Sequence, residues 1–343
     1  MTYTEADLKK HLKNESLKRL YVLYGDESYL TAFYASKIAS LAVTEDEADF
    51  NLDRLDGTAL SANAIVAAAE TLPAFAERRA VLVCDYNVAT DTQGADVWEE
   101  FFEDLPESTV LVFWYCSVLP DGKAKWKKFL AAAAKVGFVT EMNHPSVFEA
   151  AKLLCGGAKK RGCTLSDKVA EQLATRCGTD LHLLLNELDK LCACAGQGGT
   201  ITADMVTALT HETLEAKVFD LSKSIWQGDS ARAFAILNTL QADKEKATGV
   251  LAVLSSAYAD VYRVKVAQAA GERPESLTRD FAYGKREFVL RNAARDAGKV
   301  SLATLRACIA LLAKADTAMK SSSMDNWWIL QRTVSELLTR ARG

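Results

Sequence analysis

Residues 19–30 constrain the fold of this chain more than any other stretch. The segment begins with the β-forming run Leu-Tyr-Val-Leu-Tyr, turns at Gly25 and continues into apolar residues with helical spacing. We expect Ser28 to be the N-cap of this helix, since a serine hydroxyl accepts a hydrogen bond from first-turn amides. A strand, a glycine turn and a helix in this order is the arrangement of a phosphate-binding loop. The stretch therefore predicts an α/β domain built on a nucleotide-binding scaffold.

The residues of this loop do not suit a nucleotide. Asp26 and Glu27 follow Gly25, and no Gly-Lys-Ser/Thr motif is present. A working loop needs a lysine for the β and γ phosphates and a hydroxyl for magnesium, whereas two carboxylates repel phosphate. We interpret Gly25, Asp26, Glu27 and Ser28 as a degenerate loop that binds no nucleotide. We expect no cofactor.

Strand patterns alternate with helical patterns as far as about residue 142. Further strands are predicted at 80–84, 109–115 and 138–142, with another near 50–55, and helices at 4–14, 62–71, 97–104 and 125–135. This alternation is typical of a mostly parallel sheet covered by helices. It predicts an α/β domain over residues 1–140.

Beyond His144 and Pro145 only helices are predicted. Ser146 and Glu149 form a capping-box pattern, and Asp180 and Thr202 are suitable N-caps. Helices are expected at 165–177, 181–194, 246–270, 286–297, 302–319 and 326–340. We predict a small helical domain over residues 141–210 and a separate, flexibly joined all-helical domain over 211–343.

Charge is unevenly distributed along the 343 residues. Residues 244–343 carry 17 Lys/Arg against 10 Asp/Glu, although the net charge of the chain is −4. Either a face turned toward nucleic acid or an ordinary solvated helical surface accounts for this excess. On the first interpretation Lys285, Arg291 and Arg295 are the candidates for residues that face DNA.

Other classes of site find little support in the sequence. Cys192 and Cys194 lack a second pair at zinc-binding spacing, and the four histidines are scattered, so no metal site is predicted. No catalytic motif is found. The eight cysteines lie apart, several within apolar runs, which favours free thiols in a reducing cytosol. No uncharged apolar run approaches the ~18 residues of a membrane span.

The order of several short motifs over nearly the whole chain resembles a known family. The motifs span residues 21–30, 71–79, 178–181, 185–191, 218–221, 228–229 and 315–320. In this order and spacing they resemble the delta subunit of the bacterial DNA polymerase III clamp loader. The resemblance implies a degenerate AAA+-like (P-loop NTPase-like) α/β domain, a small helical lid domain and an all-α collar domain that mediates oligomerisation. It also implies a cytoplasmic bacterial protein without catalysis of its own, within the holoenzyme of a DNA-directed DNA polymerase, a nucleotidyltransferase.

The resemblance also implies partners and one functional stretch. The partners are the beta sliding clamp, the tau/gamma ATPase subunits, the delta-prime subunit and primed DNA, in a hetero-oligomer. In the family, the segment that aligns with Leu72, Pro73, Ala74 and Phe75 carries an apolar plug that enters a pocket on the clamp and opens the ring. Many members have two bulky apolar residues there, whereas this chain has Phe75 beside Ala74, with Leu72 nearby.

Three alternatives stay open at this stage. Phe75 could instead pack in the core of its own domain, as most phenylalanines do. The protein could be an active AAA+ NTPase with an atypical loop. It could also be a helical adaptor that binds nucleic acid by itself.

Overall fold

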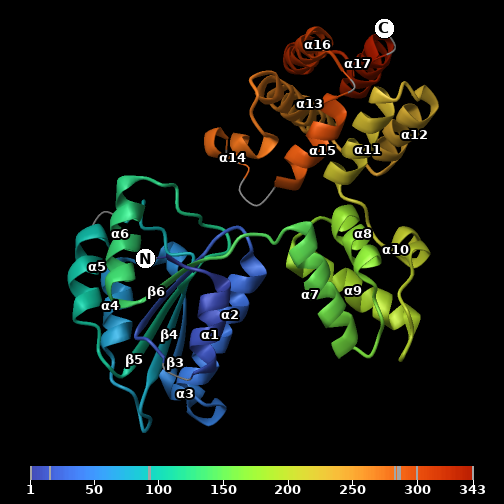
Figure 1. The fold of residues 1–343 in the computed structure, drawn as a ribbon. Helices are drawn as coiled ribbons and strands as arrows, with labels where there is room; N and C mark the ends of the chain where they lie inside the picture. Colours follow the sequence, from blue (N-terminus) through green and yellow to red (C-terminus); the bar gives the residue numbers. More distant parts are fainter. Residues whose placement is uncertain are drawn as a thin grey trace. The chain divides into compact units, whose positions relative to one another are not determined.

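The protein divides into two compact units, which cover residues 1–144 and 145–343 (Figure 1). The computed structural model describes residues 2–14, 17–91, 94–281, 283, 287–298 and 300–341. Each unit is described by itself.

The first unit is built on a parallel sheet. Among the described residues of this unit, six strands lie in the order β1-β6-β2-β5-β4-β3, and every paired neighbour is parallel. Central strands β2, β4 and β5 are almost wholly buried, which is why they appear in the sequence as continuous apolar runs. The strands are β1 (Thr2–Tyr3), β2 (Leu20–Tyr24), β3 (Leu52–Asp56), β4 (Arg79–Cys84), β5 (Thr109–Trp114) and β6 (Phe138–Glu141). The predicted strands are confirmed, and the two-residue β1, too short for a pattern, was missed.

Helices cover both faces of this sheet (Figure 1). One face packs against α1 (Glu5–Lys13) and α2 (Ser28–Ala42), with Leu8, Tyr34 and Ile38 in the core. On the other face a large aromatic cluster includes Trp98, Trp126 and Phe129. The helices there are α4 (Ala62–Glu70), α5 (Gly94–Glu103) and α6 (Ala124–Val136), and the one-turn helix α3 (Ala48–Asn51) precedes β3. The predicted α/β architecture is confirmed.

The second unit is helical, as expected. Helices α7 to α10 pack around a core that includes Leu154, Leu173 and Leu188. Helices α11 to α17 share another core, with Leu254, Leu312 and Leu337. The helices are α7 (Val147–Lys160), α8 (Asp167–Cys177), α9 (Leu181–Ala195), α10 (Ala203–Leu209), α11 (Leu214–Trp226), α12 (Ser230–Ala242), α13 (Ala247–Ala269), α14 (Leu277–Asp280), α15 (Glu287–Ala297), α16 (Leu302–Ser321) and α17 (Asn326–Ala341).

Most helix caps lie where the sequence predicted them. Asp180 and Thr202 accept from amides of the first turn, and Ser146 forms the capping box with Glu149. The prediction for Ser28 was wrong by one residue. Glu27 is the N-cap of α2, because its side chain reaches forward to accept from the Tyr29 amide at 3.2 Å.

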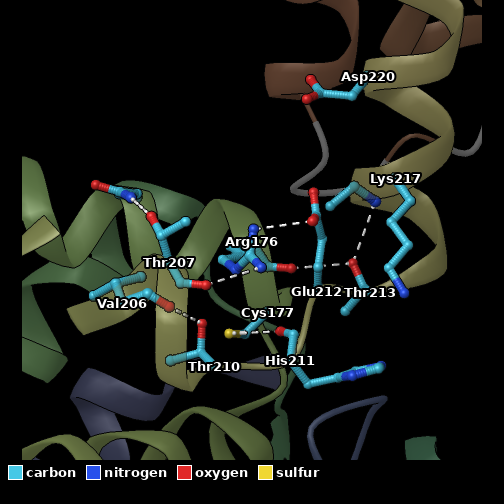
Figure 2. A network of polar contacts seen from close by, with 12 residues as sticks. Arg176, Cys177, Val206, Thr207, Thr210, His211, Glu212, Thr213, Lys217 and Asp220 are labelled. Carbon is cyan, nitrogen blue, oxygen red and sulfur yellow. Dashed lines mark hydrogen bonds and ion pairs between the residues drawn. The ribbon is translucent and has the colours of Figure 1, made fainter. Parts of the chain in front are cut away.

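The segment between α10 and α11 is held by hydrogen bonds (Figure 2). Arg176, near the end of α8, donates to the Glu212 carboxylate at 2.9 Å, and its carbonyl accepts from the Thr213 amide at 3.0 Å. The Cys177 thiol lies 3.2 Å from the His211 carbonyl. The predicted joint near residue 210 is therefore tied to α8, and the flexibility of that joint stays a prediction.

Candidate functional site

The two stretches singled out in the sequence lie at opposite ends of the sheet. Gly25 follows β2, so its loop lies at the carboxyl ends of the parallel strands. Leu72 and Phe75 precede β4, so their loop lies at the amino ends, as does α3 before β3. Strand β2 pairs with β6 on one side and β5 on the other, and the helices that follow β2 and β5 cover opposite faces. Such a switch point is where open α/β sheets usually bind ligands.

The loop after β2 is packed tightly against the chain that follows β6. Gly25 has φ +137°, and a Cβ there would lie 1.9 Å from the Met142 carbonyl oxygen. The Glu27 amide donates to the same oxygen at 3.0 Å, and the Met142 amide donates to the Tyr24 carbonyl. Phosphate-binding loops cradle their ligand with free backbone amides. Here the Glu27 amide is already used within the fold.

Both carboxylates of this loop are also used internally. Asp26 Oδ1 accepts from the His144 amide at 2.6 Å. Glu27 is 1% exposed, and its Oε2 lies 2.8 Å from His144 Nδ1. Carboxylate oxygens in this place repel phosphate. The switch point is therefore occupied by the chain's own side chains.

A third acid near this end of the sheet was missed in the sequence. Asp85 directly follows β4, is buried, and accepts from the amides of Cys116, Ser117 and Val118 at 2.8 to 3.2 Å. In P-loop NTPases a comparable aspartate holds Mg²⁺ together with the loop hydroxyl. Here the carboxylate caps three backbone amides instead. An apolar strand that ends in Asp is the signal that could have indicated it.

The thiols beside Asp85 are not suited to chemistry. Burial, followed by the nearby Asp85 charge, raises the pKa of Cys84 to about 12, and the same two causes raise the pKa of Cys116. A thiol that stays protonated at neutral pH is a poor nucleophile and a poor metal ligand. Within the described part of the chain, no group of three or more His, Cys, Asp or Glu side chains is arranged to hold a metal. None of the helices described there is both long and apolar enough to cross a membrane.

The loop before β4 presents apolar side chains to water. Phe75 is 106% exposed and Leu72 is 76% exposed, while Pro73 and Ala74 are half-buried. Phe75 has φ +57°, in the left-handed region that a bulky residue rarely adopts. The core interpretation of Phe75 is therefore wrong: the ring projects from the loop and contacts no core.

Asn51, from the last position of α3, holds this loop in place. It is 1% exposed; its Oδ1 accepts from the Ala74 amide at 2.7 Å and its Nδ2 donates to the Ala74 carbonyl at 2.9 Å. The same Nδ2 donates to the Glu47 carbonyl at 3.2 Å. We call these bonds between Asn51 and Ala74 the Asn51 clasp. Sequence reasoning missed it, because residue 51 was assigned to a strand and its partner lies 23 positions away.

Within the described part of the chain, the candidate DNA-facing residues do not form a site. Lys285 lies outside the described residues, and so does the side chain of Arg291. Arg295 is exposed on α15.

Comparisons with known proteins follow the same division of the chain. A family model described as DNA polymerase III, delta subunit, matches residues 21–138, and one for the C-terminal domain of the delta subunit matches residues 215–337. DNA polymerase III subunit delta of Bacillus subtilis (strain 168) is 26% identical over 342 residues, which cover 97% of each chain. The solved structure of the Bacillus subtilis DNA clamp loader delta protein superposes with a TM-score of 0.65 at 26% identity, over 97% of this chain and 99% of that one. With both family models matched in order, and with sequence and fold alike over almost the full length, the chain belongs to the family of DNA polymerase III delta subunits, which are clamp-loader subunits of DNA replication.

Proposed function

We propose that this protein binds the beta sliding clamp through Leu72, Pro73, Ala74 and Phe75 and opens the ring for loading onto primed DNA. The observation that carries the proposal is the state of Phe75, which is fully exposed, at positive φ, on a loop fastened by the Asn51 clasp. A rigidly presented aromatic side chain is the usual anchor of a protein interface.

The energy available from this anchor suits such a role. A phenylalanine buries about 150–250 Å² in a pocket, worth about 4–6 kcal/mol before the costs of association. A loop already held in its binding conformation loses little entropy on docking, so more of that energy appears as affinity. Ring opening needs no bond chemistry. It requires only that the surface bind the open clamp more tightly than the closed one.

We further propose that ATP acts through neighbouring subunits rather than through this chain. Asp26, Glu27 and Asp85 bond to amides or to His144 at the place where phosphates and Mg²⁺ would bind, which argues against an active NTPase. Residues 1–140 would then be an AAA+-like domain, 141–210 a lid and 211–343 a collar. The collar would join the tau/gamma ATPase and delta-prime subunits in the bacterial cytoplasm. No described contact favours the stand-alone nucleic-acid adaptor.

The test is binding of the purified chain to its cognate sliding clamp on a sensor surface. Phe75→Ala should raise Kd at least ~30-fold, because truncation of a hot-spot anchor costs ~2 kcal/mol or more. Phe148→Ala is the matched control, since Phe148 is another exposed phenylalanine, on α7. Release of clamps from closed circular DNA should fall in parallel. Wild-type affinity of Phe75→Ala for the clamp would refute the proposal.

A further inference from the structure

We infer that Phe50 is a third apolar contact of the clamp-binding surface, an inference that rests on the proposed function. Phe50 lies in α3, 25 positions before Phe75, and is 70% exposed. Of the large apolar side chains whose exposure the structure describes, Phe75, Leu72 and Phe50 are the three most exposed. All three come from the two segments that the Asn51 clasp joins.

The Asn51 clasp places Phe50 next to the loop that carries Leu72 and Phe75. Asn51 directly follows Phe50, and its side chain bonds to both the amide and the carbonyl of Ala74, which directly precedes Phe75. The strands that follow these segments pair in parallel, with Leu52 beside Ala80. Both segments therefore lie at the amino ends of neighbouring strands, and α3 lies at the lower end of the sheet in Figure 1.

The backbone of Phe50 is fixed although its ring is in water. Arg79, buried at the start of β4, donates from Nη1 to the Phe50 carbonyl at 3.0 Å and also pairs with Asp53. The ring is thus presented from a braced position, as Phe75 is. Exposed apolar side chains that gather on two joined segments favour an interaction site over a solvated surface.

The side chains of the loop indicate that the clamp is the partner that binds this surface. Ala74 contributes only a methyl group beside Phe75, so residues 74 and 75 supply one bulky apolar side chain. Phe50 supplies a second aromatic ring from across the clasp, continuous with the proposed interface. A pocket that accepts Phe75 would then bury Phe50 at its margin, where an aromatic side chain adds affinity and excludes water from the anchor.

The role of Phe50 is tested by measuring affinity for the cognate clamp on a sensor surface. The variants are Phe50→Ala, Phe75→Ala, the double variant and the control Phe148→Ala. Phe50→Ala should raise Kd about five- to tenfold, with an unchanged melting temperature, because the exposed ring supports no core. The loss of clamp affinity caused by Phe50→Ala should be smaller in the Phe75→Ala background, since the effects of neighbouring contacts are coupled.

The outcomes separate this inference from the proposed function. Wild-type affinity of Phe50→Ala together with weak binding of Phe75→Ala would overturn the role of Phe50 and leave the proposed function standing. Wild-type affinity of both variants would overturn both. A melting temperature of Phe50→Ala lowered by several degrees would assign Phe50 a structural role instead. Sedimentation that finds a dimer abolished by Phe50→Ala, with clamp affinity kept, would assign the surface to a second copy of this chain and overturn the inference.

Discussion

Replacement of Asn51 with alanine should weaken clamp binding although Asn51 is buried beneath the loop. Asn51 is 1% exposed and holds Ala74 by hydrogen bonds of 2.7 and 2.9 Å. The substitution removes both bonds and leaves Phe75 free to abandon its positive φ. We therefore expect the plug to spend most of its time in other conformations.

The magnitude follows from the two bonds. Each contributes ~1 kcal/mol, and a bulky residue in the left-handed region costs on the order of 1 kcal/mol or more. The loss of about 2 kcal/mol would lower the equilibrium constant between the binding-competent loop and its other conformations roughly thirtyfold. The apparent Kd varies inversely with the competent population, so it rises by at most that factor. The free energy of unfolding should fall by about 1–3 kcal/mol, because the Ala74 amide and carbonyl lose their partner.

A double-mutant cycle distinguishes positioning from general destabilisation. Clamp affinity should be measured for the wild type, Asn51→Ala, Phe75→Ala and the double variant, at a temperature where each is folded. If Asn51 acts by orienting Phe75, its loss costs little once Phe75 is gone, and the two effects are strongly non-additive. Asn143→Ala, at the opposite end of the sheet, is the matched control. Fully additive effects, or unchanged affinity of Asn51→Ala, would refute the reasoning.

Three further predictions follow from the same contacts. Leu72→Ala should raise the Kd for the clamp by a smaller factor than Phe75→Ala, since its aliphatic side chain buries less area; sensor binding checks this, and a loss larger than that of Phe75→Ala would contradict it. The isolated chain should show no ATP binding in calorimetry, and micromolar affinity would contradict the internal use of Asp26 and Glu27. Arg176→Ala should increase proteolytic cutting at residues 203–214, because Arg176 ties this joint through Glu212; fragment masses after brief digestion report it, and an unchanged cutting pattern would count against the tie.

The α/β core could be predicted because its strands are buried on both faces. Strands β2, β4 and β5 lie in the middle of a parallel sheet, so nearly every position is apolar and the run is visible in the sequence. The long helices of the second unit carry one buried stripe each, and their capping residues act within three positions. Both kinds of signal are local, so these strands and long helices were found, with their ends wrong by only a few residues.

The site was predictable only in part, because its supports are not local. Leu72 and Phe75 were placed by their resemblance to a family motif, and nothing in the sequence shows that their side chains are exposed. The Asn51 clasp joins segments 23 positions apart, and hydrophobic periodicity carries no information on such pairs. The positive φ of Phe75 goes against the preference of every bulky residue, so no propensity predicts it. Violations of local preference of this kind concentrate at functional sites.

If the proposed function holds, the arrangement of the first unit explains how a parallel α/β sheet can serve a protein partner. At the carboxyl ends of the strands, Asp26, Glu27 and Asp85 bond to the chain's own amides and to His144, so the usual ligand site is filled by the chain itself. At the amino ends, apolar side chains that could have entered the core are held in water by Asn51 and Arg79. A small ligand needs an enclosed crevice, whereas a ring-shaped protein needs a projecting surface that it can reach. Under the proposed function, the rigid sheet therefore positions at the amino ends of its strands a loop that docks on the clamp.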